Sequence, residues 1–300
     1  MDFEKSIRGD FSGVPLLLFC GGKGKRMENL AYKHILPSKE WLPIYNESNK
    51  LVPLFWPNFE ILLELGFKEF YILTTKEGEK VKRYFEKEFK GRNANIQLLN
   101  KENLSERVKA EGINIYIFEN NEEGTGTQIL ALEKAISDRT FVRIFGDNFF
   151  VCEKEIFKKE IEKFLLFGLE NAKKGITTSV FVPAEKVLSA SREERSLFNF
   201  AIDENGKISL IEGYGKIAIT SITVEPPSII DLLKELKQAK ASNILDIHSQ
   251  LVRNILIKQG KFYGFVINDI EAFLNVNTPD DYLKAKEISG NVRKEKIKYL

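Results

Sequence analysis

An apolar run close to the start of the chain ends abruptly in a loop rich in glycine and cations. Residues 16–20 read Leu-Leu-Leu-Phe-Cys, and residues 21–27 continue as Gly-Gly-Lys-Gly-Lys-Arg-Met. Glycines let backbone N–H groups approach an anion closely, and lysine and arginine add mobile positive charge. A buried strand that ends in such a loop therefore predicts a binding site for a polyphosphate.

The loop matches neither of the two commonest phosphate-binding signatures. A P-loop ends in Gly-Lys-Ser/Thr, but here Arg26 and Met27 stand in the last places, so no hydroxyl is available for magnesium. A dinucleotide-binding loop has three glycines, and Met27 occupies the place of the third, after Gly22 and Gly24. The alternative is a basic loop exposed to solvent, which the glycines directly after a buried strand argue against.

Composition limits the partners and the location of the protein. The chain has 300 residues, enough for one large α/β domain, and its net charge of +2 gives no sign of a surface for nucleic acid or membrane. Its two cysteines, Cys20 and Cys152, are expected to be reduced thiols. No signal peptide is visible, and no apolar run reaches the roughly 18 residues of a membrane span. We therefore expect a cytoplasmic protein that acts on small anions.

Strand-like and helix-like segments alternate along the chain, which predicts an α/β fold: a doubly wound, mainly parallel central sheet with helices on both faces. Residues 1–150 are expected to form one half of the domain, and residues 151–300 a smaller, more β-rich half. Strands are predicted at 14–19, 69–74, 113–118, 140–145, 177–182, 198–202, 207–211, 216–224 and 261–267. Helices are predicted at 58–65, 79–89, 103–109, 127–137, 153–171, 227–240, 245–259 and 279–288.

Two inserts and a tail depart from simple alternation. Residues 45–52 are polar and predict a surface loop or hairpin, whereas residues 91–109 are longer than a plain connection. The charged tail 293–299 is expected to fray, and Asp-Glu-Asn-Gly at 203–206 predicts a hairpin turn. The sequence shows no internal repeat, and in particular no hexapeptide repeat of a β-helix.

Five blocks, taken in order, resemble the sugar-1-phosphate nucleotidyltransferases, also called nucleoside-diphosphate-sugar pyrophosphorylases. The family begins with a strand, Gly-Gly-x-Gly-Thr-Arg-Leu and Pro-Lys-x-x-Leu-Pro, to which residues 21–27 and Ser-Lys-Glu-Trp-Leu-Pro at 38–43 are similar. Its Gly-Thr-Ala/Gly, Gly-Asp and Trp-x-Asp-x-Gly-Thr-Pro blocks resemble residues 124–128, 145–147 and 273–280. The resemblance covers almost the whole chain and implies a Rossmann-like nucleotidyltransferase fold with a sugar-binding second half.

The resemblance also implies a reaction in which an NTP and a sugar 1-phosphate give an NDP-sugar and pyrophosphate with the help of Mg²⁺. A phosphate oxygen of the sugar attacks the α-phosphorus, and because that oxygen is already an anion no general base is needed. Arg26 is expected to hold the triphosphate, and Lys39 to lie between the reacting phosphates. Asp147, a carboxylate at the end of a strand, is expected to bind Mg²⁺ together with Asn275.

Further contacts are assigned by the same resemblance. The residues expected to bind the nucleotide are Phe19, Gly21, Gly22, Gly24, Lys25, Glu119, Gly124 and Thr125. Those expected near the sugar are Gly146, Glu212, Tyr214 and Ser221. The sugar contacts transfer least well, because the family's Glu-Lys-Pro block is represented only by Glu-Gly-Tyr at 212–214, without the lysine.

The base is left open between UTP and GTP. Glu119 stands where the family often has a glutamine that pairs with uracil or thymine. A carboxylate only accepts hydrogen bonds, so it suits the N1–H and N2–H₂ groups of guanine and favours GTP. The placement of the inserts resembles UDP-glucose pyrophosphorylases and favours UTP. Glu119 as a plain surface residue after a strand is the remaining interpretation.

Other functions are weighed against this one. Lys25, Ser38 and Asn275 replace the family's usual Thr, Pro and Asp. Ser38 and Asn275 give some support to a regulatory homologue without turnover, whereas the retained Arg26, Lys39 and Asp147 argue against it. The poor Glu-Lys-Pro block leaves open a nucleotidyltransferase that acts on a phosphate other than that of a sugar. A glycosyltransferase is disfavoured, because Asp147 is not part of an Asp-x-Asp motif.

Overall fold

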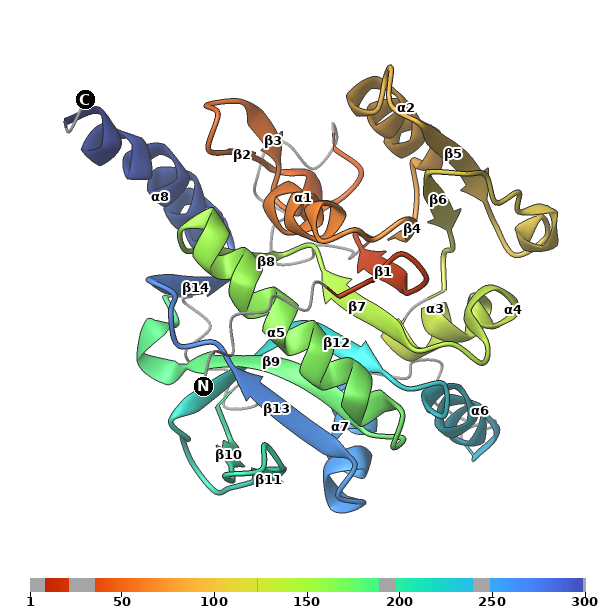
Figure 1. Ribbon diagram of the computed structural model, residues 1–300, viewed down its shortest axis with the longest axis vertical. Helices are drawn as coiled ribbons and strands as arrows, with labels where there is room; N and C mark the ends of the chain where they lie inside the picture. Colours follow the sequence, from red (N-terminus) through yellow and green to blue (C-terminus); the bar gives the residue numbers. More distant parts are fainter. Residues whose placement is uncertain (1–8, 22–35, 123, 189–197, 240–248, 299–300) are drawn as a thin grey trace, which may run out of the picture.

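The computed structural model describes residues 9–21, 36–122, 124–188, 198–239 and 249–298, with the backbone alone at residue 249 and from residue 291 onward. Among these residues the main sheet has ten strands (Figure 1). Eight of them follow the order β11-β10-β12-β7-β1-β4-β6-β5, and β9 and β13 join through β12.

The centre of the sheet is β1 (Pro15–Phe19), which pairs in parallel with β4 (Glu69–Thr74) on one side and β7 (Phe141–Phe145) on the other. Every residue of β1 is buried, as expected for a parallel strand that is covered on both faces. Beyond β4, the strands β6 (Ile113–Glu119) and β5 (Ala94–Leu99) continue the parallel order. The mainly parallel central sheet predicted from the sequence is therefore confirmed.

The sheet continues without interruption into the second half of the chain. There β12 (Ile217–Glu225) runs antiparallel to both β7 and β9 (Thr177–Pro183), and β13 (Phe262–Val266) lies parallel to β9. At the outer edge, β10 (Phe200–Ile202) and β11 (Ile208–Leu210) form the hairpin predicted around residues 203–206. The second half is thus the more antiparallel part of one sheet.

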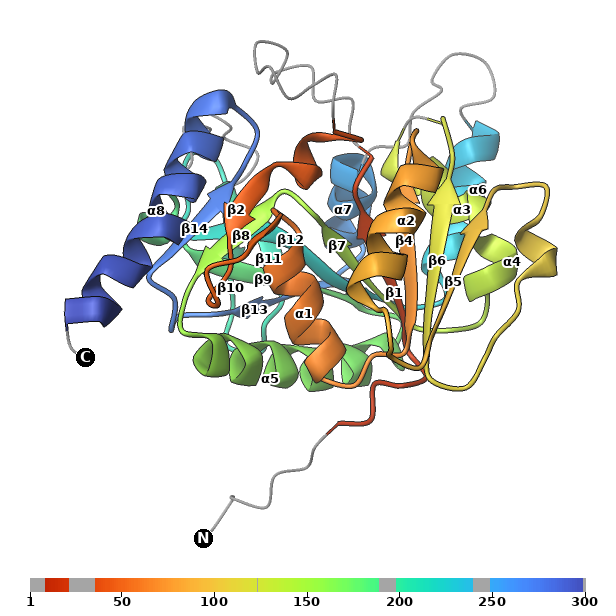
Figure 2. The same cartoon turned by 90° about the horizontal axis from the view of Figure 1, so that it is seen from above.

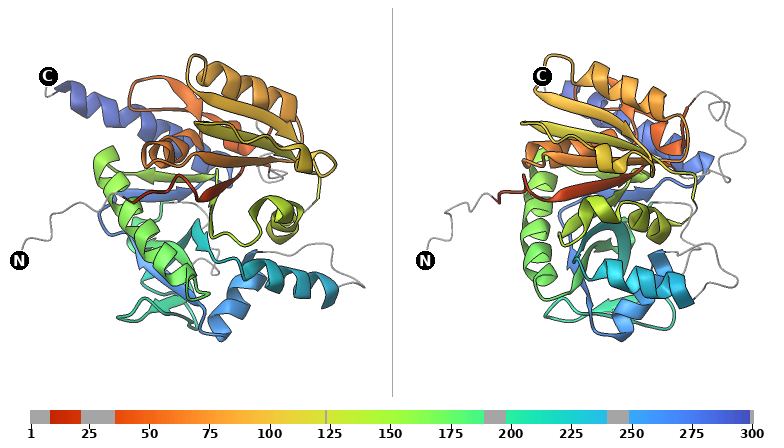
Figure 3. Two further views of the ribbon diagram at one scale, coloured as in Figure 1. Left: turned by 45° about the vertical axis from the view of Figure 1, so that its right-hand side comes forward. Right: turned by 90° about the vertical axis from the view of Figure 1, so that its right-hand side faces the viewer.

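Helices cover both faces of this sheet, as a doubly wound fold requires (Figure 3). One apolar core lies beneath α1 (Trp56–Glu64), α2 (Gly78–Glu88) and α5 (Lys154–Ala172). A second core lies beneath α3 (Thr125–Ala131), α4 (Glu133–Ile136), α6 (Ile229–Ala239) and α7 (Ser249–Lys258). In the part of the chain that the structure describes, no helix combines the length and the apolar character needed to cross a membrane.

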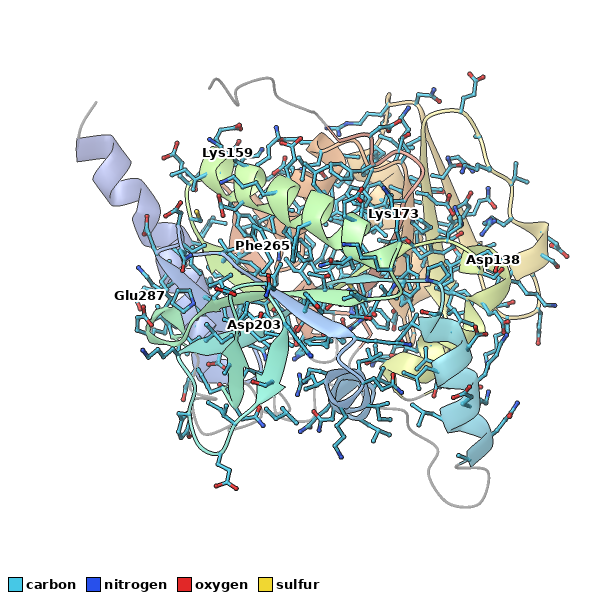
Figure 4. All side chains as sticks on the ribbon, turned by 60° about the horizontal axis from the view of Figure 1, so that its bottom comes forward. Asp138, Lys159, Lys173, Asp203, Phe265 and Glu287 are labelled. Carbon is cyan, nitrogen blue, oxygen red and sulfur yellow. The ribbon has the colours of Figure 1, made fainter. Side chains whose placement is uncertain are left out.

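The helix α5 lies across β9 and β12 and ties the second half of the sheet together (Figure 1). Phe265 of β13 lies under this helix (Figure 4). Its ring centroid is 6.0 Å from that of Phe164 and 6.0 Å from that of Phe167, both on α5. Because buried aromatic rings contribute much of the apolar area of a core, these contacts hold β13 firmly against the sheet.

The last helix and an early hairpin pack together at one end of the molecule, opposite β5 and α4 (Figure 2). The hairpin consists of β2 (Pro43–Tyr45) and β3 (Leu51–Pro53), and confirms the turn expected at residues 45–52. The Tyr282 hydroxyl of α8 (Pro279–Lys298) donates to the Pro43 carbonyl at 3.0 Å. This helix extends ten residues beyond the predicted end at residue 288, as far as Lys298, and so includes most of the charged tail.

The prediction of a helix at residues 103–109 is wrong. Only a single 3-10 turn, η4 (Leu104–Glu106), forms there, and β5 precedes it without having been predicted. The side-chain amides of Asn95 and Gln97 both donate to the Val108 carbonyl, at 2.8 and 2.7 Å. These bonds hold the segment after η4 extended across the sheet, where a helix could not satisfy them.

Two further differences concern short elements. The helix predicted at 127–137 is divided into α3 and α4 at Leu132, which is fully buried in the second core. The strands β8 (Asn148–Val151) and β14 (Ala272–Asn275) form a separate two-stranded sheet and were not predicted. Each has four residues, too few for a clear alternation of apolar and polar side chains.

An ion-pair cluster closes the edge of the sheet where β4 begins. Glu69 is 1% exposed and accepts two hydrogen bonds from Arg139, at 2.7 and 2.9 Å. The Tyr71 hydroxyl and the Lys109 ammonium also donate to it, at 2.8 and 3.1 Å. Burial alone would raise the pKa of Glu69, but the hydrogen bonds and charge of Arg139 lower it to about 2.

We predict that Glu69→Gln lowers the free energy of unfolding at pH 7 by about 2 kcal/mol, because it leaves Arg139 without its buried partner. The pKa of Glu69 is depressed in the folded state, so its stabilisation is complete above the ordinary value of 4.5 and is lost as the pH falls toward 2. Denaturant titrations at pH 7 and pH 3 should show the difference between the two proteins shrinking. The exposed Glu170→Gln serves as control and should change stability by less than about 0.5 kcal/mol.

Candidate active site

The carboxyl ends of β1 and β7 lie side by side where the chain changes direction across the sheet. After β1 the chain adds β4, β5 and β6 on one side, with β6 between the other two, and then returns to add β7 on the other side. The Gly146 N–H donates to the Phe19 carbonyl at 3.0 Å, and the Cys20 N–H to the Leu73 carbonyl at 2.8 Å. Open α/β sheets bind ligands in the crevice at such a switch point. The glycine-rich loop leaves β1 at this point, and the Gly-Asp pair leaves β7.

Two of the glycines expected in the site are needed because there is no room for a side chain. A Cβ atom on Gly21 would lie 2.8 Å from the Thr75 nitrogen. One on Gly146 would lie 3.0 Å from the Phe55 Cβ and 3.1 Å from the Cys20 Sγ. The close packing of these glycines brings the two strand ends together.

Lys39 reaches this switch point from the 3-10 turn η3 (Lys39–Trp41). Its Nζ lies 2.7 Å from Asp147 Oδ2, 2.6 Å from Asn277 Oδ1 and 3.2 Å from the Val276 carbonyl. The side chains of Lys39 and Asp147 are only 11% and 14% exposed, so their ion pair is poorly screened by water. The structure thus brings together the predicted phosphate-binding lysine and the predicted metal-binding aspartate.

Ser38 fixes the start of η3 to the end of β1. Its Oγ donates to the Cys20 carbonyl at 2.6 Å. The proline that the family usually has at this place would lack that donor. The Ser38 hydroxyl therefore links the Ser-Lys-Glu-Trp-Leu-Pro segment at 38–43 to the end of β1. A proline at position 38 could not make this hydrogen bond.

Asp147 is held from a second side by the strands β8 and β14. Its Oδ1 accepts from Asn148 Nδ2 at 2.9 Å, and its carbonyl accepts from the Val276 N–H at 2.8 Å. Asn275 lies directly opposite Asn148 in this two-stranded sheet. The candidate metal ligands Asp147 and Asn275, 128 residues apart in the sequence, are therefore neighbours in the fold.

The chemistry of these donors suits Mg²⁺. A carboxylate and an amide oxygen are hard ligands, and Mg²⁺ is usually bound by one or two protein groups with water and phosphate oxygens completing its shell. Within the described residues there is no cluster of three or more histidines, cysteines, aspartates or glutamates of the kind that encloses a metal without help from a substrate. Asp147 and Asn275 fit a metal that arrives with a phosphate.

Asn148 is a site residue that the sequence analysis did not single out. It is 1% exposed, and its Oδ1 accepts from the Ser221 N–H at 3.2 Å while its carbonyl accepts from Asn58 Nδ2 at 2.8 Å. Ser221 lies in a stretch of β12 where the register against β9 shifts, an irregularity that is common beside active sites. The signal available in the sequence was a polar residue directly after the Gly-Asp pair.

Glu119, which is expected to contact the base of the nucleotide, already accepts one hydrogen bond from the protein. Its Oε2 accepts from the Gly78 N–H at 2.6 Å, at the start of α2. Gly124 and Thr125 begin α3 at the same edge of the sheet. Phe19, expected to contact the nucleotide, is buried, and its ring stacks on that of Phe145 at a centroid distance of 5.1 Å.

The remaining candidates are divided between an exposed connection and undescribed residues. Glu212 and Tyr214 lie in the exposed connection between β11 and β12, where the Tyr214 ring is 5.6 Å from that of Phe198. Both stay predictions as sugar contacts. Four candidates fall outside the described residues, and their roles also stay predictions: Gly22, Gly24, Lys25 and Arg26.

Comparison with solved structures identifies the fold. A UDP-glucose pyrophosphorylase in complex with UDP-glucose matches with a TM-score of 0.62 and 19% identity, over 93% of this chain and 99% of that chain. A protein described as a glucose-1-phosphate thymidylyltransferase, from Bacillus anthracis, matches with a TM-score of 0.60 and 16% identity, over 92% and 95%. The inositol-1-phosphate CTP transferase of T. maritima matches with a TM-score of 0.56 and 14% identity, over 95% and 98%.

The chain thus has the fold of the sugar-phosphate nucleotidyltransferases over almost its whole length. No family model matches the sequence, and no curated protein matches it. The structural likeness supports the sequence resemblance as far as the fold.

A buried carboxyl group lies directly beneath the site. Glu40 is 4% exposed, and its Oε2 has no hydrogen-bond partner among the described residues. Burial raises the pKa of Glu40 to about 7, against the opposing charge of Lys39 and with the help of Asp147. Burial likewise raises the pKa of the neighbouring Cys20 thiol, so that this cysteine is expected to be unreactive.

We predict that Glu40→Gln stabilises the protein above neutral pH. Because the pKa of Glu40 is raised in the folded state, its ionisation destabilises the fold as the pH increases from 4.5 through 7. Glutamine has nearly the same shape without the charge, so the free energy of unfolding at pH 8 should rise by on the order of 1–3 kcal/mol. The gain should be small at pH 5. Denaturant titrations at both pH values check this, and a variant less stable than the parent at pH 8 contradicts it.

Proposed function

We propose that this chain is an enzyme that transfers a nucleotidyl group from a nucleoside triphosphate to a sugar 1-phosphate and releases pyrophosphate. One observation supports this most strongly. Lys39 and Asp147, from blocks 108 residues apart, meet at 2.7 Å in the crevice at the switch point of the sheet. A fold shared with a pyrophosphorylase solved with UDP-glucose adds to this support.

In the proposed reaction, a phosphate oxygen of the sugar 1-phosphate forms a bond to the α-phosphorus of the triphosphate. The bond between that phosphorus and the oxygen bridging to the β-phosphate breaks, and pyrophosphate leaves with the electron pair. No proton has to be removed from the attacking oxygen. The described residues around Asp147 accordingly offer an ammonium and amides for charge stabilisation instead of a general base.

Four residues are proposed to bind or stabilise the phosphates and the metal in this reaction. Lys39 places its ammonium between the reacting phosphates, where it reduces the repulsion between two anions. Arg26 is proposed to hold the triphosphate and the departing pyrophosphate. Asp147 and Asn275 would hold Mg²⁺, which supplies positive charge to the triphosphate when bound.

Two bases are supported by different observations. Glu119 Oε2 is engaged by Gly78, which leaves Oε1 to accept from a base that carries N–H donors, as guanine does. UTP is favoured by the resemblance of the inserts and by the neighbour that was solved with UDP-glucose. We therefore propose GTP or UTP as the nucleotide.

A second candidate function is transfer to a phosphate that is not on a sugar. The likeness to the inositol-1-phosphate CTP transferase favours it, and so does the exposed position of Glu212 and Tyr214, which leaves the sugar contacts poorly defined. A catalytically inactive homologue is a weaker alternative, because Lys39 and Asp147 are both retained and in contact.

The reaction is tested by measuring pyrophosphate release with Mg²⁺. Each of ATP, CTP, GTP, UTP and dTTP is combined with the 1-phosphates of glucose, mannose, galactose, N-acetylglucosamine and inositol. We expect release with one sugar 1-phosphate and with GTP or UTP. Release with inositol 1-phosphate alone would support the second candidate, and no release from a folded protein would support the inactive homologue.

We predict that Asp147→Ala lowers kcat by at least about a thousandfold, because the metal loses its carboxylate ligand. Circular dichroism should show that the variant is still folded, since the site lies at the edge of the sheet and outside its cores. The matched control is Asp231→Asn, on the exposed face of α6, with unchanged kcat. Magnesium-dependent turnover by Asp147→Ala would rule out the role given to this residue.

We predict that Glu119 influences whether the enzyme prefers GTP or UTP. Glu119→Gln keeps an oxygen for the Gly78 N–H and turns an amide donor toward the base. The ratio of kcat/KM for GTP to that for UTP should fall by at least about tenfold, as expected when a hydrogen-bonding partner is reversed. If the ratio does not change, Glu119 serves only to cap α2.

A further inference from the structure

One short turn supplies two of the acceptors that Lys39 has among the described residues. Lys39 Nζ donates to Asp147 Oδ2 and to two acceptors on the turn after β14, the Val276 carbonyl and Asn277 Oδ1. Asn277 Oδ1, at 2.6 Å, is as close as the carboxylate of Asp147 at 2.7 Å. The ammonium is therefore shared between a carboxylate and a neutral amide oxygen.

The turn that carries Asn277 is held rigidly at the start of α8. Asp281 is 1% exposed, and its Oδ2 accepts from the N–H groups of Asn277 and Thr278 and from the Thr278 hydroxyl, at 3.1, 3.0 and 2.9 Å. The next residue, Tyr282, donates to the Pro43 carbonyl, four residues after Lys39. Asn277 and Lys39 are thus fixed relative to each other by contacts that do not involve the side chain of Asp147.

Asn277 stands where the family block Trp-x-Asp-x-Gly-Thr-Pro has glycine. The backbone does not require glycine here, because Asn277 is not among the described residues with positive φ. The side chain is therefore an addition of this chain to the family pattern. In the structure it is placed on the lysine expected to contact the phosphates.

We propose that Asn277 is a positioning residue that keeps Lys39 in the site when a divalent cation binds to Asp147. A cation on Asp147 Oδ2 repels the ammonium that lies 2.7 Å from the same oxygen, so the two compete. Asn277 Oδ1 and the Val276 carbonyl then retain the ammonium at the crevice, ready for phosphate. The inference rests on the proposed function for the identities of the cation and the phosphate.

The competition has a measurable consequence without any turnover. The hydrogen bond from Lys39 to Asn277 contributes more when a cation has displaced Lys39 from Asp147 than when the ion pair with Asp147 is intact. Asn277 therefore favours binding of the cation. Removal of Asn277 should weaken the cation by about tenfold, within the range expected for one hydrogen bond to a charged group. Removal of the ammonium should have the opposite effect, because Asp147 then has no competitor.

The test is a double-mutant cycle on the binding of Mn²⁺, followed by the electron paramagnetic resonance of the free ion in the absence of nucleotide. Asn277→Ala and Asn277→Gly should each bind Mn²⁺ about tenfold more weakly than the parent. Lys39→Met should bind it several-fold more tightly, and Asn277→Ala should have no further effect in the Lys39→Met background. The control Asn205→Ala, in the exposed turn between β10 and β11, should bind as the parent does.

Three results would overturn the proposal. Asn277→Ala could weaken Mn²⁺ equally with and without Lys39, which would mean that Asn277 acts on the ion directly or through the fold. The Asn277 variants could bind as tightly as the parent, or the parent could bind no Mn²⁺. Failure of the proposed function is seen separately, as an absence of pyrophosphate release from a protein whose Mn²⁺ cycle behaves as described. Thermal unfolding of each variant verifies that it is folded.

Discussion

The burial of β1 on both faces is the constraint on which the other features depend. A strand paired in parallel on either side and covered by two apolar cores cannot shift its register without exposing apolar side chains. Its carboxyl end is therefore fixed, and so is the carboxyl end of β7 beside it. The packing of the cores fixes the relative position of these two strand ends, and Gly21 and Gly146 allow the chain segments around them to approach closely. The reactive groups are then carried by rigid elements, which is the arrangement that precise positioning needs.

Buried charge is compensated differently at the two ends of the parallel strands. At the edge where β4 begins, the Glu69 carboxylate receives hydrogen bonds from Arg139, Lys109 and Tyr71, and the cluster stabilises the fold. At the opposite edge, burial holds Glu40 near its neutral form, and Lys39 and Asp147 are kept close together with little water. Buried charge without full compensation is typical of functional sites, and the phosphates and cation of the proposed reaction would supply the missing partners here.

The long, strongly patterned elements could be predicted from the sequence, and the contacts between distant short ones could not. The bounds of β4 and nearly those of α5 follow from local apolar patterns. By contrast, β8 and β14 are recognisable only as a pair, because residues 148 and 275 stabilise each other across the fold. Lys39 and Asp147 were found through sequence blocks, whereas the place of Asn277 on Lys39 depends on how α8 packs against residue 43. No local pattern contains that information.

The packing of α8 against the early hairpin also sets the order in which the protein is completed during synthesis. A nascent chain that has reached residue 270 contains Lys39, Asp147 and every strand of the main sheet, but not the turn at residues 276–277 or the tyrosine that donates to Pro43. Such a chain can pair every strand of the main sheet, but it lacks the part of the first core that β14 and α8 supply, including Phe273, Val276 and Tyr282. The site is completed only when a loop of more than 200 residues closes between Pro43 and Tyr282, so a ribosome-bound intermediate would contain the strands of the sheet before it contains the complete site.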